Sequence, residues 1–167
     1  MESNQIEAII KNITKLILTN QQKMIREEDI KNLCDSSLDF AQIISSVYEN
    51  LKKIGFDLIT TKFLDNKYYV LTSEGKDDDL TPSQYGTLAL ILALSKELDE
   101  NLKINDLKEL FMDVWASDVE NLIQKDFLRK IKIENIELVK ITPLGKAIMK
   151  NIIQDLNLKS LLDSIKK

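Results

Sequence analysis

Apolar residues recur three and four positions apart over the first third of the chain, a spacing typical of amphipathic helices. Between about residues 4 and 19 these positions are Ile6, Ile9, Ile10, Ile13, Leu16 and Ile17. A short second helix is expected around Ile30. A third is expected from Leu38 to Ile54, for which Ser36-Ser37 offers an N-cap and Gly55 a C-terminal end.

The pattern then changes to β-branched and aromatic residues, which favour strands. Residues 56–64 and 68–73 are of this kind, and Asp65-Asn66-Lys67 between them is a plausible turn. These two runs predict a β-hairpin that follows the third helix.

The same order of elements is predicted in the second part of the chain. Thr81-Pro82-Ser83-Gln84 is a capping box with proline at the first helical position, and it starts a helix that is apolar over much of its circumference. Asn105 is expected to cap the next helix, and the capping box Ser117-Asp118-Val119-Glu120 to start a short third one. Residues 128–141 predict a hairpin that turns at Glu134-Asn135.

One stretch occurs twice within this order. Met24 to Cys34 is echoed by Lys103 to Phe111, and each copy lies between two apolar helices. Three helices followed by a hairpin is the order of a winged helix. The sequence therefore predicts a fold that is mainly α with small β-hairpins (α+β), built from tandem winged-helix domains.

An acidic segment separates the two predicted units. Glu74-Gly75-Lys76-Asp77-Asp78-Asp79 combines a glycine with a run of carboxylates and contains nothing to bury. We expect an N-terminal winged helix over 1–73, a linker over 74–80, and a C-terminal winged helix over 81–167 that ends in a helical extension. Adjacent carboxylates on such a linker are expected to be solvated and not to hold a metal.

The residue inventory argues against catalysis and against a bound cofactor. The chain of 167 residues has no histidine, so it lacks the usual general base and the commonest metal ligand. Its single cysteine, Cys34, cannot form an internal disulfide, and none of its four glycines belongs to a phosphate-binding loop. We expect no enzymatic activity and no catalytic, metal-binding or cofactor-binding residues.

Hydropathy predicts no contact with a membrane. The longest apolar run, Leu88 to Leu94, is far shorter than the roughly 18–20 residues that span a bilayer. The residues after Met1 lack the basic region of a signal peptide, which indicates a cytoplasmic protein.

Winged helices bind either nucleic acid or other proteins, and the charge of the recognition helix helps to distinguish the two. The formal net charge of the chain is −4. The first recognition helix exposes Asp39, Gln42 and Glu49, and the second, over Asp118 to Asp126, also starts with acidic side chains. DNA would place phosphates there, so the charges favour a protein partner.

The second hairpin carries a cluster of cations that could contact nucleic acid. The residues concerned are Lys125, Arg129, Lys130, Lys132 and Lys140. The alternative is a solvated strand face, because Glu134 and Glu137 dilute the positive charge.

Two apolar features suggest protein contacts. The isoleucines of the first helix, Ile6, Ile9, Ile10 and Ile13, either pack within their own unit or mediate self-association, and we expect self-association. Trp115 either fills the core between two helices or anchors a partner, and we expect a helix of a partner to bind near Phe111 and Trp115. The tail from Leu158 to Ile165 either folds back or docks on a partner.

The order of elements resembles the KITE group, tandem winged-helix proteins that bind kleisins in chromosome-organising SMC complexes. Gly55 to Ile59, Tyr68 to Thr72 and Leu80 to Ile91 are similar to segregation and condensation protein B. The MAGE homology domain is similar at Ile25 to Leu33 and at Gly55 to Leu71. Lys103 to Asp106 and Ile133 to Ile136 depart from the bacterial family, which has a Pro-Ile-Thr-Arg-type segment and a glycine-rich wing there.

This resemblance implies a non-catalytic, homodimeric adaptor that binds a kleisin-like partner and helps an SMC ATPase in chromosome condensation and segregation. Contact with DNA would be indirect or weak, and the protein would be nucleoid-associated or nuclear. Thr142-Pro143-Leu144-Gly145-Lys146 is also similar to the wing-to-helix junction of winged-helix regulators. A DNA-binding transcription regulator is therefore the alternative.

Overall fold

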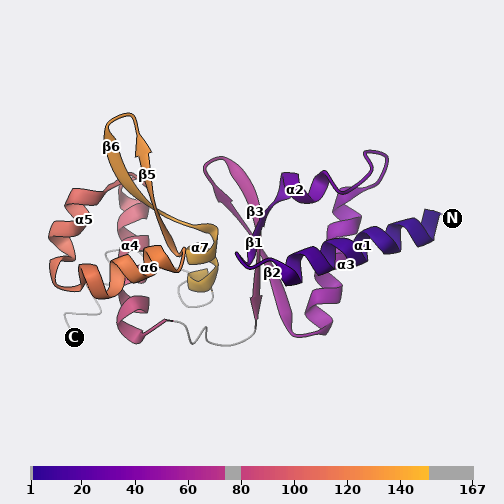
Figure 1. Cartoon of the computed structure of the whole chain (residues 1–167), viewed down its shortest axis with the longest axis horizontal. Coiled ribbons are helices and arrows are strands. Elements are labelled where there is room, and N and C mark those ends of the chain that lie inside the picture. The colour runs from indigo at the N-terminus through magenta and orange to yellow at the C-terminus, as the bar shows by residue number, and fades with distance from the viewer. Residues whose placement is uncertain (1, 74–79, 151–167) are drawn as a thin grey trace. The chain divides into compact units, whose positions relative to one another are not determined.

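The computed structural model describes residues 2–73 and 80–150 and divides the chain into two compact units, Met1–Lys76 and Asp77–Lys167 (Figure 1). The run Asp77-Asp78-Asp79 and the predicted helical extension, with Leu158 to Ile165, lie outside the described residues.

The first unit contains three helices and a three-stranded sheet. Its elements are α1 (Glu2–Thr19), β1 (Met24–Arg26), α2 (Glu27–Lys31), α3 (Phe40–Lys53), β2 (Phe56–Phe63) and β3 (Asn66–Ser73). The strands are antiparallel in the order β1-β3-β2, so that Val70 of β3 lies between Met24 of β1 and Ile59 of β2.

The second unit repeats this order and adds a helix at its end. Its elements are α4 (Pro82–Glu97), β4 (Leu102–Lys103), α5 (Ile104–Leu110), the 3-10 turn η1 (Met112–Val114), the π-helix η2 (Trp115–Val119), α6 (Glu120–Gln124), β5 (Leu128–Ile133), β6 (Ile136–Ile141) and α7 (Pro143–Lys150). The sheet order is β4-β6-β5, again antiparallel. The prediction of an α+β fold of tandem winged helices is therefore confirmed.

The repeated stretch of sequence marks the same structural step in both units. Met24 to Cys34 contains β1 and α2, and Lys103 to Phe111 contains the end of β4 and α5. In each case a short strand pairs with the second strand of the hairpin and leads directly into a helix. The repeated sequence therefore corresponds to the short strand that each winged helix adds to its hairpin and to the helix that follows this strand.

The core of the first unit lies between its helices and its sheet. Ile13 and Ile17 of α1 pack with Val47 and Leu51 of α3, and all four side chains are at most 3% exposed. Leu58 of β2 closes the cluster from the sheet. Helical spacing predicted the apolar faces of these two helices, whereas Ile13, expected at a self-association surface, belongs to this core.

Glu27 joins helix α2 to the hairpin of the first unit. Its carboxylate accepts a hydrogen bond from Lys31 Nζ at 2.7 Å and from the Tyr69 hydroxyl at 2.8 Å, and it pairs with Lys67 Nζ at 2.6 Å. Burial alone would raise the pKa of Glu27, but these three partners outweigh it and lower the pKa to about 2. Burial and the bond to Glu27 together raise the pKa of Tyr69.

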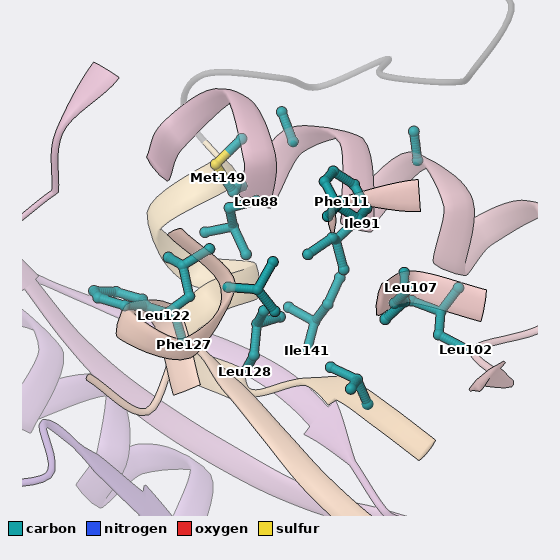
Figure 2. Packing of buried hydrophobic residues seen from close by; sticks show 14 of the residues in the cluster. Leu88, Ile91, Leu102, Leu107, Phe111, Leu122, Phe127, Leu128, Ile141 and Met149 are labelled. Atoms are coloured by element: carbon teal, nitrogen blue, oxygen red, sulfur yellow. The ribbon is translucent and has the colours of Figure 1, made fainter. Parts of the chain in front are cut away.

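The core of the second unit draws side chains from helices and strands along the unit, from α4 to α7 (Figure 2). Leu88 and Ile91 of α4 meet Leu122 of α6, Leu128 of β5 and Met149 of α7, and each is at most 1% exposed. Helix α4 is thus central to its unit, as its apolar circumference predicted.

The start of α4 has the predicted capping box. Thr81 Oγ1 accepts from the Gln84 backbone N–H at 3.2 Å, and Gln84 Oε1 accepts from the Thr81 backbone N–H at the same distance. The proline at the first helical position has no N–H to satisfy. Leu80, assigned to the linker from the sequence, is buried in the core of the second unit.

Two details of the first unit differ from the prediction. Helix α3 is capped by Asp39 and not by Ser36-Ser37, because the Asp39 carboxylate accepts from the backbone N–H groups of Ala41 and Gln42 at 2.9 and 3.4 Å. The hairpin turns at Leu64-Asp65, which have φ angles of 46° and 62°, so that Asn66 already belongs to β3.

Two predicted helix starts in the second unit are also wrong. Helix α5 begins at Ile104 after strand β4, one residue before the expected cap Asn105. Ser117 caps no helix; its hydroxyl donates to the Val114 carbonyl at 3.4 Å, and the chain passes through η2 into α6. The turn at Glu134-Asn135 is confirmed by the ends of β5 and β6.

Candidate interaction surfaces

Helix α3, at the recognition position of the first unit, exposes few cations. Gln42, Ser45 and Glu49 are exposed after the Asp39 cap, whereas Lys52 and Lys53 lie in the last turn. Helices that read base edges do so mainly from their N-terminal part. This surface is therefore a poor match for a DNA groove.

The corresponding helix of the second unit, α6, is shorter than predicted. Within the expected range Asp118 to Asp126 it covers only Glu120–Gln124, and Glu120 is exposed at its start. Asn121 is half-buried and donates its amide to the Ser117 carbonyl at 2.7 Å. This helix also presents an acidic start where a phosphate would have to lie.

Some of the basic residues predicted on the second hairpin form ion pairs within their own unit. Arg129 makes a bidentate pair with Asp126, with two contacts of 2.7 Å from Nη2. Lys140 lies 3.8 Å from Glu100, which accepts a hydrogen bond from Lys146 at 2.6 Å. That hydrogen bond is the main reason why the pKa of Glu100 is lowered. Much of the positive charge is thus paired within the unit.

Lys130 and Lys132 are exposed members of this cluster, as is Lys125 at the end of α6. They are two residues apart on β5 and therefore share one face of the hairpin. Glu137 lies opposite Lys132 on β6. The basic face of this wing consists mainly of two lysines.

The four isoleucines of α1 do not share one environment. Ile13 is fully buried in the core of its own unit, so a second chain cannot reach it without opening that core. Ile9 and Ile10 are half-buried and pack against the same cluster, and Ile6 is half-buried. The large apolar side chains exposed on the described part of α1 are Leu16 and Leu18, each 38% exposed.

An open groove of about 660 Å³ runs along one flank of α1. The residues that line it are Glu7, Ile10, Lys11, Thr14, Lys15, Leu18, Thr19 and Asn50. Its floor is apolar at Ile10 and Leu18, and its rim carries both signs of charge. Leu16 has the same exposure as Leu18 but does not line the groove.

The end of α5 is the second surface with exposed apolar side chains. Leu110 is 62% exposed and Met112 is 75% exposed. Phe111 between them is only 6% exposed and fills the core, where Figure 2 shows it beside Ile91 of α4. Phe111, predicted to contact a partner, is therefore a core residue that lies beneath this surface.

Trp115 is half-buried and packs against the same core. Its indole N–H donates to Glu120 Oε1 at 3.1 Å, and Lys108 Nζ lies 5.5 Å from its ring centroid. Both neighbours come from the same unit, so the ring is held in place before any partner binds.

A buried carboxylate fixes the π-helix that follows. Asp118, 4% exposed, accepts hydrogen bonds from the hydroxyls of Ser83 and Thr87 at 2.5 and 3.0 Å, and Gln84 Nε2 donates to the Ser117 carbonyl at 3.3 Å. Burial alone would raise the pKa of Asp118, but the hydrogen bonds from Ser83 and Thr87 outweigh burial and lower the pKa. The start of α4 thereby anchors η2.

Leu110 and Met112 were not singled out from the sequence. Leu110 follows Leu107 by three residues, so helical spacing placed it on the buried face of α5. The helix ends at Leu110 and η1 begins at Met112, which turns both side chains outward. Only the break between these elements distinguishes Leu110 from its buried neighbours.

These features define the class of protein, a tandem winged helix with acidic or neutral recognition helices and exposed apolar side chains at α1 and α5. Within residues 2–73 and 80–150, no three His, Cys, Asp or Glu side chains are grouped so that they could hold a metal ion. Among the helices of the same ranges, none is both long and apolar enough to cross a membrane.

No protein-family model matches the chain, and neither does any curated protein sequence. Among solved structures, the chain is similar to a chain of the Nse1-Nse3-Nse4 complex, with a TM-score of 0.56. The likeness covers 88% of this chain and 73% of that chain at 9% sequence identity. At this identity it establishes a shared fold, in agreement with the tandem winged-helix resemblance of the sequence.

Proposed function

We propose that this chain is a non-catalytic adaptor that binds a kleisin-like partner in an SMC-type complex for chromosome condensation and segregation. The shared fold with a chain of the Nse1-Nse3-Nse4 complex supports this proposal, because that chain belongs to an assembly of several proteins. The adaptor would act in the cytoplasm at the nucleoid, or in the nucleus.

The observation that carries the proposal is the contrast between the recognition helices and the end of α5. Helices α3 and α6 start with acidic or neutral side chains, whereas Leu110 and Met112 are exposed beside a preformed core. Adjacent exposed apolar side chains are typical of protein interaction sites. A polypeptide is therefore a better ligand than a duplex.

Affinity purification from the native cell, followed by mass spectrometry, tests this function. We expect a kleisin-like protein and an SMC ATPase to copurify with the full chain in stoichiometric amounts. Purification of the chain with neither protein, at native expression levels and low salt, would refute the proposal.

We further propose that the adaptor is a homodimer that associates through the groove on α1. Glu7 and the lysines Lys11 and Lys15 lie on the same groove, so two copies related by a twofold axis can place opposite charges against each other. Leu18 would supply the apolar contact. Ile13 stabilises the helix from its buried side and makes no contact across the interface.

The two exposed leucines of α1 provide a matched test. Leu18→Glu is expected to shift the protein toward monomer in light scattering after size exclusion, and Leu16→Glu to leave its mass unchanged. A wild-type monomer at high micromolar concentration, or equal effects of the two substitutions, would contradict the proposed interface.

The alternative function, a DNA-binding regulator, is supported by the exposed pair Lys130 and Lys132 on one face of β5. It predicts binding to duplex DNA that weakens with salt. Neutralising both lysines with glutamine would reduce the slope of log K against log salt by about two. Absence of duplex binding at low salt would exclude this alternative.

A further inference from the structure

We infer that the end of α5 binds an apolar segment of a partner protein that is flanked by lysine and arginine. This inference rests on the proposed adaptor function and specifies which partner sequence this surface would recognise. The three parts of the surface are the exposed Leu110 and Met112, the half-buried Trp115, and an acidic surround.

The apolar part is small but well placed. A single exposed apolar residue needs no explanation, but Leu110 and Met112 flank a core residue and are more exposed than Leu98, at 52%, and Ile133, at 49%. Methionine is unbranched and adapts its shape to different ligands. Such a surface suits the apolar face of a helix or an extended segment.

The charge of the surround selects the partner. Between Ile104 and Gln124 the exposed charged side chains are four carboxylates and one lysine, which gives a formal charge of −3. The carboxylates belong to Asp106, Glu109, Asp113 and Glu120. The lysine is Lys108, and it lies over the Trp115 ring. Cations on the partner would gain from this field, whereas carboxylates would be repelled.

The surface is also rigid. The hydrogen bonds from Ser83 and Thr87 to Asp118, and from Gln84 to the Ser117 carbonyl, attach η2 to the start of α4. Phe111 attaches the other end of the surface to the core. A site that is ordered before binding loses less conformational entropy when it binds.

Two designed amphipathic peptides of about 18 residues test the inference, since that length makes several helical turns. They share one leucine-rich face and differ only in the flanks of that face, which carry lysine in one and glutamate in the other. Binding to the full chain is measured by titration calorimetry and followed through the fluorescence of Trp115, the only tryptophan. We expect the lysine peptide to bind at least about tenfold more tightly, with an affinity that falls as salt is added.

Variants locate the binding. Leu110→Ser combined with Met112→Ser is expected to weaken the lysine peptide by about tenfold or more. The matched control, Leu98→Ser combined with Ile133→Ser, removes two other exposed apolar side chains of the same unit and should change little. Glu109→Lys with Asp113→Lys should reverse the preference between the two peptides.

Equal binding of the two peptides, or full binding by the Leu110→Ser and Met112→Ser variant, would overturn the inference. All three double variants are first checked by circular dichroism for a native fold. If copurification recovers a kleisin-like partner that this variant still holds, the inference fails and the adaptor function stands. If the lysine peptide binds as expected and no kleisin-like partner copurifies, the inference about the end of α5 stands and the proposed adaptor function fails.

Discussion

Gly145→Ala should destabilise the second unit, although alanine is the better helix former. Gly145 lies in α7, where Figure 1 places the helix directly after the hairpin. A Cβ at this position would overlap the carbonyl oxygen of Phe127 and would lie 2.9 Å from Cγ2 of Ile141. Glycine is therefore required here by a close approach between α7 and the start of β5.

The size of the effect follows from how firmly that carbonyl is held. The Phe127 oxygen accepts from the Thr142 backbone N–H at 3.0 Å and from the Thr142 hydroxyl at 3.1 Å. Moving it away from a new methyl group would weaken both hydrogen bonds. Overpacking costs up to about 3 kcal/mol. The helix propensity of alanine returns about 1 kcal/mol, so we expect a net loss of about 2 kcal/mol.

Gly86→Ala is the matched control. Gly86 lies in α4, is exposed, and a Cβ there would meet no atom within 4 Å. The same substitution in the same unit should therefore stabilise it by up to about 1 kcal/mol. The two variants are expected to differ in sign.

Urea unfolding followed by Trp115 fluorescence measures both effects. Trp115 is in the second unit, so its signal reports that unit even when the two units unfold separately. A Gly145→Ala variant as stable as the wild type, with an unchanged slope in urea, would refute the packing between α7 and β5 described here.

Three further substitutions test how much buried and half-buried side chains, polar and apolar, contribute to stability. Glu27→Gln should cost about 1 kcal/mol at neutral pH after allowance for solvent screening. Because the folded pKa of Glu27 is lowered, its contribution is present above the ordinary pKa of 4.5 and is lost as pH falls toward about 2, so the variant should lack this part of the pH dependence. Asp118→Asn should cost about 1–2 kcal/mol, seen by Trp115 fluorescence, because Ser83 and Thr87 both donate to Oδ2 of Asp118 and a neutral amide oxygen in its place is a weaker acceptor than a carboxylate. The folded pKa of Asp118 is also lowered, so its contribution to the stability of the second unit is lost only in acid, below its ordinary pKa of 3.8. Leu122→Ala, at a fully buried position, should cost about 2–5 kcal/mol in urea unfolding.

The longer elements could be predicted from the sequence because each has several repeats of its own period. Leu128–Ile133 and Ile136–Ile141 were predicted with the bounds that the structure shows, and α4 starts at the predicted Pro82. Strands β1 and β4 have three residues and two, too few for a period to be visible. They are defined by pairing with residues far along the chain, as Leu102 is by Val139.

The candidate surfaces were harder to predict because a count of charges does not show which charged groups are paired. Counting charges on β5 found Arg129 and Lys130 together, but only the fold shows that Arg129 is paired with Asp126. Glu100, which pairs with Lys140, is 40 positions away from it in sequence, so no local pattern links the two. Local sequence identifies which groups are charged, and tertiary structure decides which of them remain available.

The acidity of the second unit has two consequences that must be tested together. Carboxylates at the start of α6 disfavour phosphates, and Glu120 is one of the same carboxylates that surround Leu110 and Met112. Replacing Glu109 and Asp113 by lysine should therefore weaken a basic partner and, at the same time, create some affinity for duplex DNA at low salt. If partner binding is lost without any gain in DNA affinity, charge alone does not keep this winged helix away from nucleic acid, and the shape of its short recognition helix becomes the stronger explanation.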